Sequence, residues 1–449
     1  MIEGDVVVIG FGTGAIGCIR TILSKTRDRH VTVIEKRDFD TYSPCGMPYA
    51  LGGHTDPEHL KHEFPGNPGR LKKVLGTEAV EVDRDRKIVV ARNLRTGETE
   101  DISYKTLVLD LGAEPFIPPI KFNRALLDNG VYTFTSHRDL EKLLGRLPQI
   151  KNAVVIGAGA IGLEVALSLH EKGKNVALVD MMAHPLPSAF DPDMGREVRK
   201  LIPDSIKTHF GTLVKEITGE TSVEKVILSD GTEIPADTVI LSAGVRPNTG
   251  LAEKMGLSVT RQGISVNEKM QTSDPDIYAV GDCVQTFSAI DRRPLGMRIA
   301  PPALHQGTVA GLNIAGEETE YRGTTGAFVT VVNGTEVAGV GLRERDVKGA
   351  VSARVKIKSV PEYMGGEDVA LKLICDLDGK IVGAQAVGPG AKDIINRVSV
   401  ALYSGMGVED IYHVEHAYCP PVSDVFDPLF MAAENLLKKW KRKQQKGQP

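Results

Sequence analysis

The chain has 449 residues, of which 25% are charged and 41% hydrophobic, and its formal net charge at pH 7 is −4. This length exceeds what one hydrophobic core supports, so we expect roughly two to four domains. The near-neutral charge gives no reason to expect nucleic acid or an anionic membrane as the main partner.

Membrane insertion and secretion are also not indicated by the sequence. No run reaches the ~18 apolar residues of a membrane span, and residues 1–5 lack the basic start of a signal peptide. The five cysteines are odd in number and widely spread, unlike a secreted disulfide framework. We therefore expect a cytoplasmic protein.

The first predicted element is a nucleotide-binding unit. Residues 6–9 form an apolar strand, a glycine-rich turn and a helix follow, and residues 31–35 form a second strand that ends in an acid. The glycines permit a tight turn and a close approach to a pyrophosphate, and the helix N-terminus adds partial positive charge. The terminal acid would accept hydrogen bonds from a ribose. The predicted nucleotide-binding residues of this unit are Gly10, Gly12, Gly14, Ala15, Glu35 and Lys36.

A cysteine without a neighbouring thiol comes next. Cys45 lies in the run Tyr42 to Tyr49, where a CxxC pair would need a cysteine in place of Pro48 and a CxxxxC pair one in place of Ala50. Redox chemistry at this thiol must then pass through a single-cysteine intermediate. The alternative role of Cys45 is that of a small buried hydrophobe.

A second nucleotide-binding unit repeats the pattern over residues 153–180. Each unit is closed by a return segment, residues 107–112 in the first unit and residues 238–244 in the second. After Asp180 come Met181 and Met182, which offer no cation for a 2′-phosphate, so we expect NADH rather than NADPH, although NADPH remains possible. The residues of the second unit and of the two return segments that we expect to contact nucleotide are Gly112, Gly157, Gly159, Ile161, Gly162, Asp180 and Gly244.

The character of the chain changes towards its C-terminus. Residues 272–282 form a turn and a strand that ends in Gly281 and Asp282, facing the first nucleotide site. From about residue 326, alternating strand patterns at 328–332 and 370–374 precede a helix at 391–404, which indicates a separate α+β domain with an antiparallel sheet. We expect the basic stretch 438–443 to be a solvated, fraying end.

Four sequence features together resemble one branch of a known family. They are Ser43-Pro44-Cys45-Gly46, Ser242 to Asn248, Glu164 after the second glycine turn, and Tyr418-Cys419-Pro420-Pro421. The chain resembles, over nearly its whole length, the single-cysteine branch of the FAD- and NAD-linked pyridine nucleotide-disulfide oxidoreductases. That branch contains coenzyme A disulfide reductases, NADH oxidases, NADH peroxidases and persulfide reductases.

The resemblance implies an α/β fold with two Rossmann-like domains, one for FAD and one for NAD, and a C-terminal α+β dimerisation domain. The protein would be a homodimer. In this family the Gly-Asp pair at 281–282 contacts the flavin nucleotide. The implied domains are the first part of the FAD domain at 1–115, the NAD domain at 116–245, the second part of the FAD domain at 246–325 and the dimerisation domain at 326–449.

The resemblance also implies roles for single residues. Glu164 would help to place the nicotinamide against the flavin; its alternative is an ordinary exposed helix acid. Tyr418 would come from the opposite subunit and meet the substrate near Cys45. Tyr363 loosely matches a second active-site tyrosine, with packing as an equal alternative. Cys419, where relatives have alanine, would be either a resolving thiol across the dimer or a substitute for a small residue.

Two departures from the family pattern stand out. Asp110 occupies a position where the family has a small residue, and the sequence offers no account of it. The turn 10–14 also contains no histidine, whereas peroxidases and water-forming oxidases carry one there, which lowers the case for peroxide reduction. No metal is expected, because the spacing of His54, His59 and His62 matches no metal-binding pattern.

These features predict a homodimeric FAD enzyme that uses NADH to reduce a small disulfide, persulfide or polysulfide through Cys45, with coenzyme A disulfide as the leading substrate. The intermediate would be a mixed disulfide of Cys45 with the small thiol. A nearby helix N-terminus or the flavin would lower the pKa of the thiol. The alternatives are an NADH oxidase that reduces oxygen and a reductase of a small electron-carrier protein.

Overall fold

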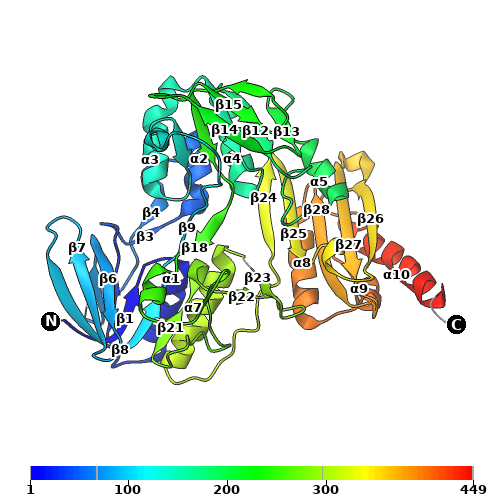
Figure 1. Cartoon of the computed structure of the whole chain (residues 1–449). Coiled ribbons are helices and arrows are strands. Elements are labelled where there is room, and N and C mark those ends of the chain that lie inside the picture. Colours follow the sequence, from blue (N-terminus) through cyan, green and yellow to red (C-terminus); the bar gives the residue numbers. More distant parts are fainter. Residues whose placement is uncertain (1, 67–68, 296, 447–449) are drawn as a thin grey trace.

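The first nucleotide-binding unit is built on a seven-stranded sheet (Figure 1) in the computed structural model, which describes residues 2–66, 69–295 and 297–446. Its strand order is β5-β2-β1-β8-β7-β6, and β21 pairs in parallel with β8. The central strands are buried on both faces, as parallel strands covered by helices are. The strands are β1 (Ile2–Ile9), β2 (Val31–Ile34), β5 (Leu71–Val74), β6 (Thr77–Asp83), β7 (Ile88–Asn93), β8 (Thr99–Leu109) and β21 (Ile277–Ala279).

Two helices of this unit cross in close contact. They are α1 (Thr13–Lys25) and α7 (Ala300–Ile314). A Cβ on Gly307 would clash with Gly14 O, and one on Gly311 would lie 2.7 Å from the Cβ of Thr21. The crossing therefore brings a segment from beyond residue 300 against the helix that follows the first glycine turn.

The second unit has a five-stranded, all-parallel sheet in the order β10-β17-β11-β12-β13. A three-stranded sheet, β14-β15-β16, lies beside it. The elements are β10 (Val131–Thr133), α3 (His137–Arg146), β11 (Asn152–Ile156), α4 (Ala160–Glu171), β12 (Asn175–Asp180), α5 (Pro192–Arg199), β13 (Lys207–Phe210), β14 (Val214–Thr218), β15 (Lys225–Leu228), β16 (Glu233–Pro235) and β17 (Thr238–Leu241).

Two short strands connect the units. β9 (Ala113–Pro115) leads into the second unit, β18 (Val245–Pro247) leads back, and the two pair antiparallel. The guanidinium of Arg246 lies 4.2 Å from the ring centre of Phe116, which adds a cation–π contact to this connection.

The C-terminal domain is an antiparallel sheet in the order β24-β25-β28-β27-β26. One face packs against three helices, and the other faces the second unit. The predicted strands and the helix at 391–404 are present, which confirms the mixed α/β class. The elements are β24 (Phe328–Val332), β25 (Thr335–Gly341), β26 (Val351–Lys358), β27 (Asp368–Cys375), β28 (Ile381–Val387), α8 (Ala391–Ser404), α9 (Val408–His413) and α10 (Pro428–Lys446).

The basic stretch 438–443 is solvated as expected, but it is helical where an irregular end was expected. Helix α10 continues through the basic stretch, where Lys439 Nζ donates to Ser352 O and Trp440 Nε1 donates to Leu377 O, each at 2.9 Å. Leu429 and Leu436 on the same helix are buried against the sheet. Among the described residues, none of the helices combines the length and the apolar character needed to cross a bilayer.

Short elements fill the connections between the larger ones. The short helices and strands are β3 (Thr41–Tyr42), α2 (Met47–Gly52), β4 (Lys61–His62), α6 (Gly250–Lys254), β19 (Val259–Thr260), β20 (Gly263–Ile264), β22 (Thr286–Phe287) and β23 (Pro294–Leu295). The single 3₁₀ turns are η1 (Pro44–Gly46), η2 (Pro57–Leu60), η3 (Arg124–Leu126), η4 (Leu147–Gln149), η5 (Gly281–Cys283), η6 (Glu344–Asp346) and η7 (Glu362–Met364).

Candidate active site

The first glycine turn packs tightly against neighbouring backbone and side-chain atoms. Gly10 has φ of +94°, and a Cβ there would clash with Asp110 O. A Cβ on Gly14 would lie 2.8 Å from Val280 Cγ2. Glu35, only 5% exposed at the end of β2, accepts hydrogen bonds from Phe11 N at 2.8 Å and from the guanidinium of Arg37 at 2.9 Å. The acid predicted to meet a ribose is therefore held against the turn.

Two residues beside this turn differ in importance from what the sequence predicted. Arg37, which the sequence did not single out, donates to both Glu35 and Phe11 O and so fixes the acid in place. Lys36, in contrast, lies exposed between them. The signal for Arg37 was a basic side chain two residues after the acid that ends the second strand segment.

Asp110 lies beneath the first turn. It follows the last residue of β8, is 7% exposed, and its Oδ2 accepts hydrogen bonds from Gly12 N at 3.0 Å and Ala15 N at 2.8 Å. Burial raises the pKa of this carboxyl to about 7, and the charges of Asp282 and Glu35 add to the rise against the two backbone donors. The aspartate that departs from the family pattern thus binds the turn itself.

The second glycine turn leaves room for a nucleotide. A Cβ on Gly157 would clash with Ser242 O and one on Gly162 would clash with Gly157 O, but a Cβ on Gly159 would meet open space. Asp180 at the end of β12 accepts hydrogen bonds from Ala158 N at 2.6 Å and from Met182 N at 2.7 Å. Ile161, 40% exposed on the first turn of α4, lies at the mouth of this turn.

The two return segments end in matching glycines. Gly112 and Gly244 have φ of +67° and +106°, and each would direct a Cβ into open space. They stand at the starts of the paired strands β9 and β18, and Asn248 N donates to Gly112 O. Both backbones can therefore be approached closely by a ligand between the units.

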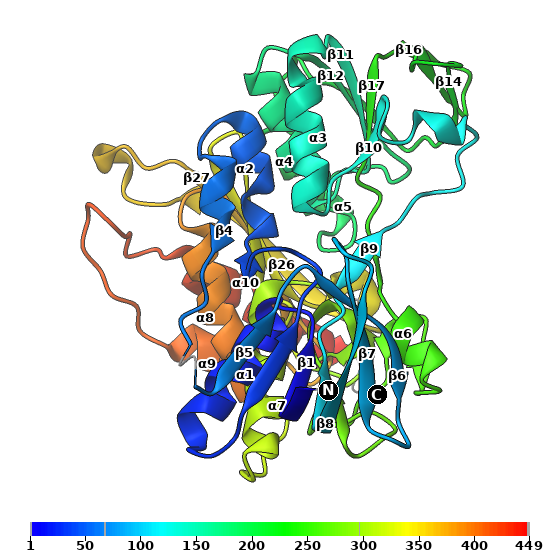
Figure 2. The same ribbon diagram turned by 90° about the vertical axis from the view of Figure 1, so that its left-hand side faces the viewer.

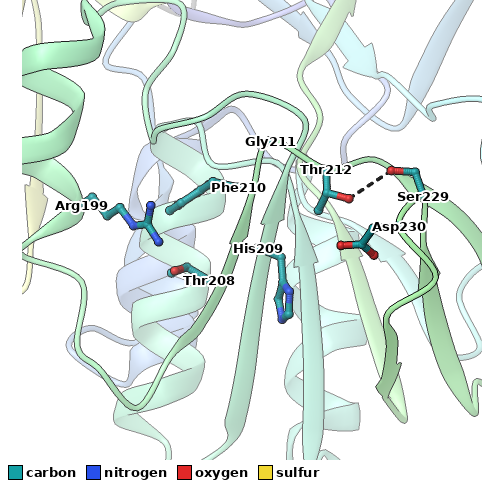
Figure 3. A pocket seen from close by; sticks show the side chains of 8 residues that line it. All are labelled: Arg199, Thr208, His209, Phe210, Gly211, Thr212, Ser229 and Asp230. Atoms are coloured by element: carbon teal, nitrogen blue, oxygen red, sulfur yellow. Dashed lines mark hydrogen bonds between the residues drawn. The ribbon is translucent and has the colours of Figure 1, made fainter.

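A polar hollow of about 490 Å³ adjoins the second turn. It opens at the end of β13, where Gly211 N donates to Asp180 O. Figure 3 shows the hydroxyls of Thr212 and Ser229 joined across one rim, with Arg199 beside Phe210 on the other. Cys45 is not part of its lining, so this hollow belongs to the surroundings of Asp180 and not to the thiol.

Cys45 is held near the second unit by helix α2. It lies in the turn η1, directly before α2, whose Met47 and Leu51 are buried in the same core as Leu163 of α4. Ser168 Oγ of α4 also donates to Pro48 O at 2.7 Å. The exposed cysteine is thus positioned against the helix that carries Glu164.

The surroundings of the thiol are acidic. Partial desolvation raises the pKa of Cys45, and the negative charges of Glu164 and Asp282 raise it further. The lowering of this pKa expected from a helix N-terminus is not seen as a net effect in the protein chain, because burial and the charges of two carboxylates from different units raise it. The expected effect of the flavin on this pKa stays a prediction.

Glu164 is partly buried and tied to the C-terminal domain. Thr330 Oγ1 of β24 donates to Glu164 Oε1 at 2.6 Å, while burial raises the pKa of the carboxyl. It is therefore not an ordinary exposed helix acid. Tyr49, which the sequence-based reasoning did not single out, is coupled to both Glu164 and Cys45, whose charges raise its pKa in addition to burial. The available signal was its spacing four residues after Cys45.

The tyrosines and the second exposed cysteine lie on the C-terminal domain. Tyr418 is 50% and Tyr363 75% exposed, and partial desolvation together with the neighbouring phenol of Tyr363 raises the pKa of Tyr418. Segments 359–367 and 414–427 project to the same side of the molecule (Figure 2, gold and orange-red at the left). Cys419 is exposed in the second segment, where its N–H donates to Ser423 Oγ. The other three cysteines are buried, namely Cys18, Cys283 and Cys375.

A family model described as pyridine nucleotide-disulphide oxidoreductase matches residues 4–307, and the model of the dimerisation domain of that family matches residues 328–429. The chain belongs to this family. It is therefore an NAD(P)H-dependent flavoprotein oxidoreductase, and the predicted cofactors, FAD and a nicotinamide nucleotide, are confirmed at this level.

Similar proteins lie within the same branch. An NADH oxidase of Methanocaldococcus jannaschii is 35% identical, with 97% of this chain and 99% of the relative covered. An NAD(P)H coenzyme A polysulfide/persulfide reductase of Pyrococcus horikoshii is 31% identical, with coverage of 96% and 98%. The structure of an NAD-dependent persulfide reductase from A. fulgidus matches with a TM-score of 0.90 at 30% identity, covering 98% of this chain and 84% of that one.

One structural neighbour carries coenzyme A in its name. The reduced CoADR-RHD of Bacillus anthracis matches with a TM-score of 0.92 at 27% identity, covering 98% of this chain and 81% of that one. These similarities confirm the predicted family branch. In this pyridine nucleotide-disulphide oxidoreductase, both glycine turns fit a dinucleotide, because each keeps the close-packed glycines and the acid at the next strand end. Within the described ranges, no group of three or more metal-ligating side chains is arranged to hold an ion.

Proposed function

We propose that this chain is a homodimeric NADH-dependent reductase of a small disulfide, persulfide or polysulfide, with Cys45 as its redox thiol and coenzyme A disulfide as the leading substrate. One observation carries the proposal. The thiol of Cys45 is coupled to Asp282 from the first unit and to Glu164 from the second, so it lies where the two units meet. A cytoplasmic location suits a chain whose five cysteines are all free.

The two units divide the cofactors between them. FAD would be held by the turn 10–15, by Glu35 and by the Gly281-Asp282 pair, and NADH by the turn 157–162 and Asp180. Bound FAD relays two electrons from NADH to sulfur. The acid at 180, with Met181 exposed beside it, supports NADH over NADPH, because a carboxylate repels a 2′-phosphate. The domain limits given above for the sequence remain part of this proposal.

The thiol chemistry follows from the absence of a neighbouring cysteine. Cys45 thiolate attacks one sulfur of the substrate disulfide, a Cys45–S–S–R bond forms, and the other half leaves as a thiolate that takes up a proton. Reduction of the mixed disulfide by two electrons returns the Cys45 thiolate and releases the second thiol. Overall, NADH, one proton and RSSR give NAD⁺ and two RSH.

A proton donor for the leaving thiolate is available on the C-terminal domain. Tyr418 and Tyr363 are neighbours and both are exposed, so a phenol of this pair can donate to a bound group. We propose that this tyrosine pair of one subunit meets Cys45 of the other. The match of residues 328–429 to a dimerisation domain and the exposed apolar side chains of that domain support the arrangement.

An NADH oxidase is the second candidate. The 35% identical relative from Methanocaldococcus jannaschii carries that name, and oxygen reduction would need no thiol. The relative from Pyrococcus horikoshii, named a coenzyme A polysulfide/persulfide reductase, favours the first candidate. The two candidate functions differ in whether turnover requires Cys45.

Turnover by Cys45→Ser separates them. Under anaerobic conditions we expect the wild-type enzyme to oxidise NADH with coenzyme A disulfide, and Cys45→Ser to lose at least ~100-fold of this rate. Cys419→Ser is the matched control and should retain it. Oxygen consumption that survives Cys45→Ser, together with no disulfide turnover by the wild type, would contradict the proposal. A mass spectrum of the unreduced protein should show a coenzyme A adduct on Cys45.

A further inference from the structure

Asp110 is a buried acid of the first nucleotide site that the proposed chemistry does not use. It stands at the carboxyl end of β8, between β1 and β21, directly under the turn that opens α1. Its Oδ2 is bonded to Gly12 N and Ala15 N. These N–H groups lie at the start of α1, where a helix presents donors and partial positive charge to an anion.

The other carboxyl oxygen faces the glycines of the same site. A Cβ on Gly14 would lie 3.2 Å from Asp110 Oδ1, and a Cβ on Gly281 would clash with it. Oδ1 therefore lies between the first glycine turn and η5, the two segments assigned to the flavin nucleotide. The glycines leave just enough space for this oxygen.

The charged and titratable groups around Asp110 are mostly acids. Glu35 faces it from the end of β2, Asp282 and the thiol of Cys283 from η5, and the thiol of Cys18 from α1. From α7 comes only a neutral group, Gln306, which accepts from Gly281 N. The nearby cations act on other groups: Arg37 pairs with Glu35, and Arg298 donates to Asp282 O. Asp110 therefore has no cation of its own among the contacts that the structure describes.

We propose that Asp110 holds the pyrophosphate of FAD as a neutral carboxylic acid, which takes up one proton when FAD binds, so that FAD affinity falls with rising pH. This inference rests on the assignment of FAD to the first unit. A pyrophosphate and a carboxylate at one buried helix N-terminus repel each other. Protonation removes the repulsion and turns Oδ1 from an acceptor into a donor to phosphate oxygen.

The sign of the pH dependence follows from linkage. Before FAD binds, burial and the neighbouring acids raise the pKa of Asp110 to about 7. The negative charge of the pyrophosphate raises this pKa further, so the complex holds a proton that the free protein has lost above pH 7. Between the two pKa values, the dissociation constant of FAD should rise roughly tenfold for each pH unit.

FAD release from the holoenzyme tests the proposal. The holoenzyme is diluted at pH values from 6 to 9, and the dissociation constant is read from the fluorescence of released flavin. We expect the wild-type constant to rise above pH 7 and that of Asp110→Asn to stay flat, because the amide donates at every pH. Asp276→Asn is the matched control, since Asp276 pairs with Lys87 at the other end of β21 and should leave the wild-type slope intact.

A slope in Asp110→Asn equal to that of the wild type would overturn the inference and assign the proton to another acid, such as Asp282. If Asp110→Asn does not fold, calorimetry of FAD binding to wild-type apoprotein in buffers of different ionisation enthalpy decides. Uptake of about one proton at pH 8 supports the inference, and no uptake overturns it. These measurements do not involve a sulfur substrate, so an enzyme without disulfide turnover can still pass them.

Discussion

The reactivity of Cys45 depends on its two acidic neighbours. Glu164 and Asp282 both raise the pKa of the thiol, so the protein chain by itself holds the cysteine in its less reactive protonated form at neutral pH. A thiol of this kind is protected from indiscriminate oxidation.

This coupling can be measured with Glu164→Gln. Removal of the negative charge should lower the pKa of Cys45 and so raise the thiolate fraction near neutral pH severalfold. The pH profile of Cys45 alkylation by iodoacetamide, followed by mass spectrometry, reports the shift. Glu171→Gln, at the far end of α4 where Glu171 pairs with His54, should leave the profile unchanged. A profile that does not move in Glu164→Gln would mean that the carboxylate does not act on the thiol.

For single residues, the sequence predicted which residues belong to the site better than it predicted what surrounds them. Cys45, Glu164 and Asp282 could be proposed from motifs that resemble a family. The sign of the pKa shift at Cys45 could not, because it depends on how three segments more than a hundred residues apart pack together. Tyr49 was missed for the same reason, since a tyrosine in a short helix has no special meaning until Glu164 lies beside it.

The glycines of the second turn have separable structural and binding roles. Because a Cβ on Gly159 meets open space, Gly159→Ala should fold with unchanged thermal stability. It should bind NADH roughly tenfold more weakly, since the methyl group stands where a pyrophosphate must approach. Titration of NADH binding and a melting curve check both parts. Gly145→Ala on the exposed face of α3 is the control and should bind NADH normally.

Gly162→Ala should behave differently from Gly159→Ala. Its Cβ would clash with Gly157 O, so we expect loss of stability together with loss of NADH binding. Equal effects of the two substitutions on stability would show that the open space at Gly159 is filled by protein.

A buried ion cluster joins the C-terminal sheet to the second unit. Lys372 of β27 is 4% exposed, and its Nζ lies 3.3 Å from Asp191, 3.0 Å from Asp193 and 2.7 Å from Glu344. Lys372→Met would leave these carboxylates without their cation, and we expect a loss of about 3–5 kcal/mol in the free energy of unfolding. Chemical denaturation measures it.

The neighbouring strand offers a matched control for this prediction. Lys356 of β26 pairs with Asp368 at the surface, where both side chains are about half exposed. Lys356→Met should cost no more than ~1 kcal/mol. A similar loss in both variants would indicate that the buried cluster is not what holds the two domains together.

Predictions of elements succeeded where periodicity was continuous. The helix at 391–404 and the strand at 328–332 were predictable because apolar residues recur there at regular spacing. The helix at the end of the chain was missed because lysines dominate the composition there. The buried side of α10, formed by Leu429, Ala432, Ala433 and Leu436, has helical spacing, and Trp440 continues it by one more turn.

At the scale of the whole molecule, the C-terminal domain exposes an apolar surface suited to a second copy of the chain. Its exposed members are Val400, Tyr403, Val414, Tyr418, Val422, Val425 and Phe426. Phe426→Asp should shift the protein from dimer to monomer in sedimentation analysis, because a charge would have to be desolvated at the interface. Leu94→Asp, in an exposed turn of the first unit, should remain dimeric.

The same variant tests the role of the tyrosine pair. If Tyr418 acts across the interface, monomeric Phe426→Asp should lose at least ~10-fold of its disulfide turnover. Reduction of a dye by NADH through the flavin should be retained. A monomer with full disulfide turnover would show that each subunit holds a complete site.

The domain order could be predicted because the nucleotide-binding pattern occurs twice and the return segments match it. The identity of the small thiol in the proposed substrate could not be predicted from the sequence. Specificity would come from exposed side chains of two subunits around Cys45, and no local pattern in one chain records which of them meet.

The position of α10 has one more consequence, for solubility under stress. β26 is the outer strand of its sheet, and such a strand presents free backbone groups to which strands of other molecules can add. Lys439 occupies one of these groups, Ser352 O, and places a positive charge beside the strand. A chain that ends before this turn of α10 would keep its nucleotide sites. Its edge strand would be exposed, and partly unfolded molecules could aggregate by strand addition there.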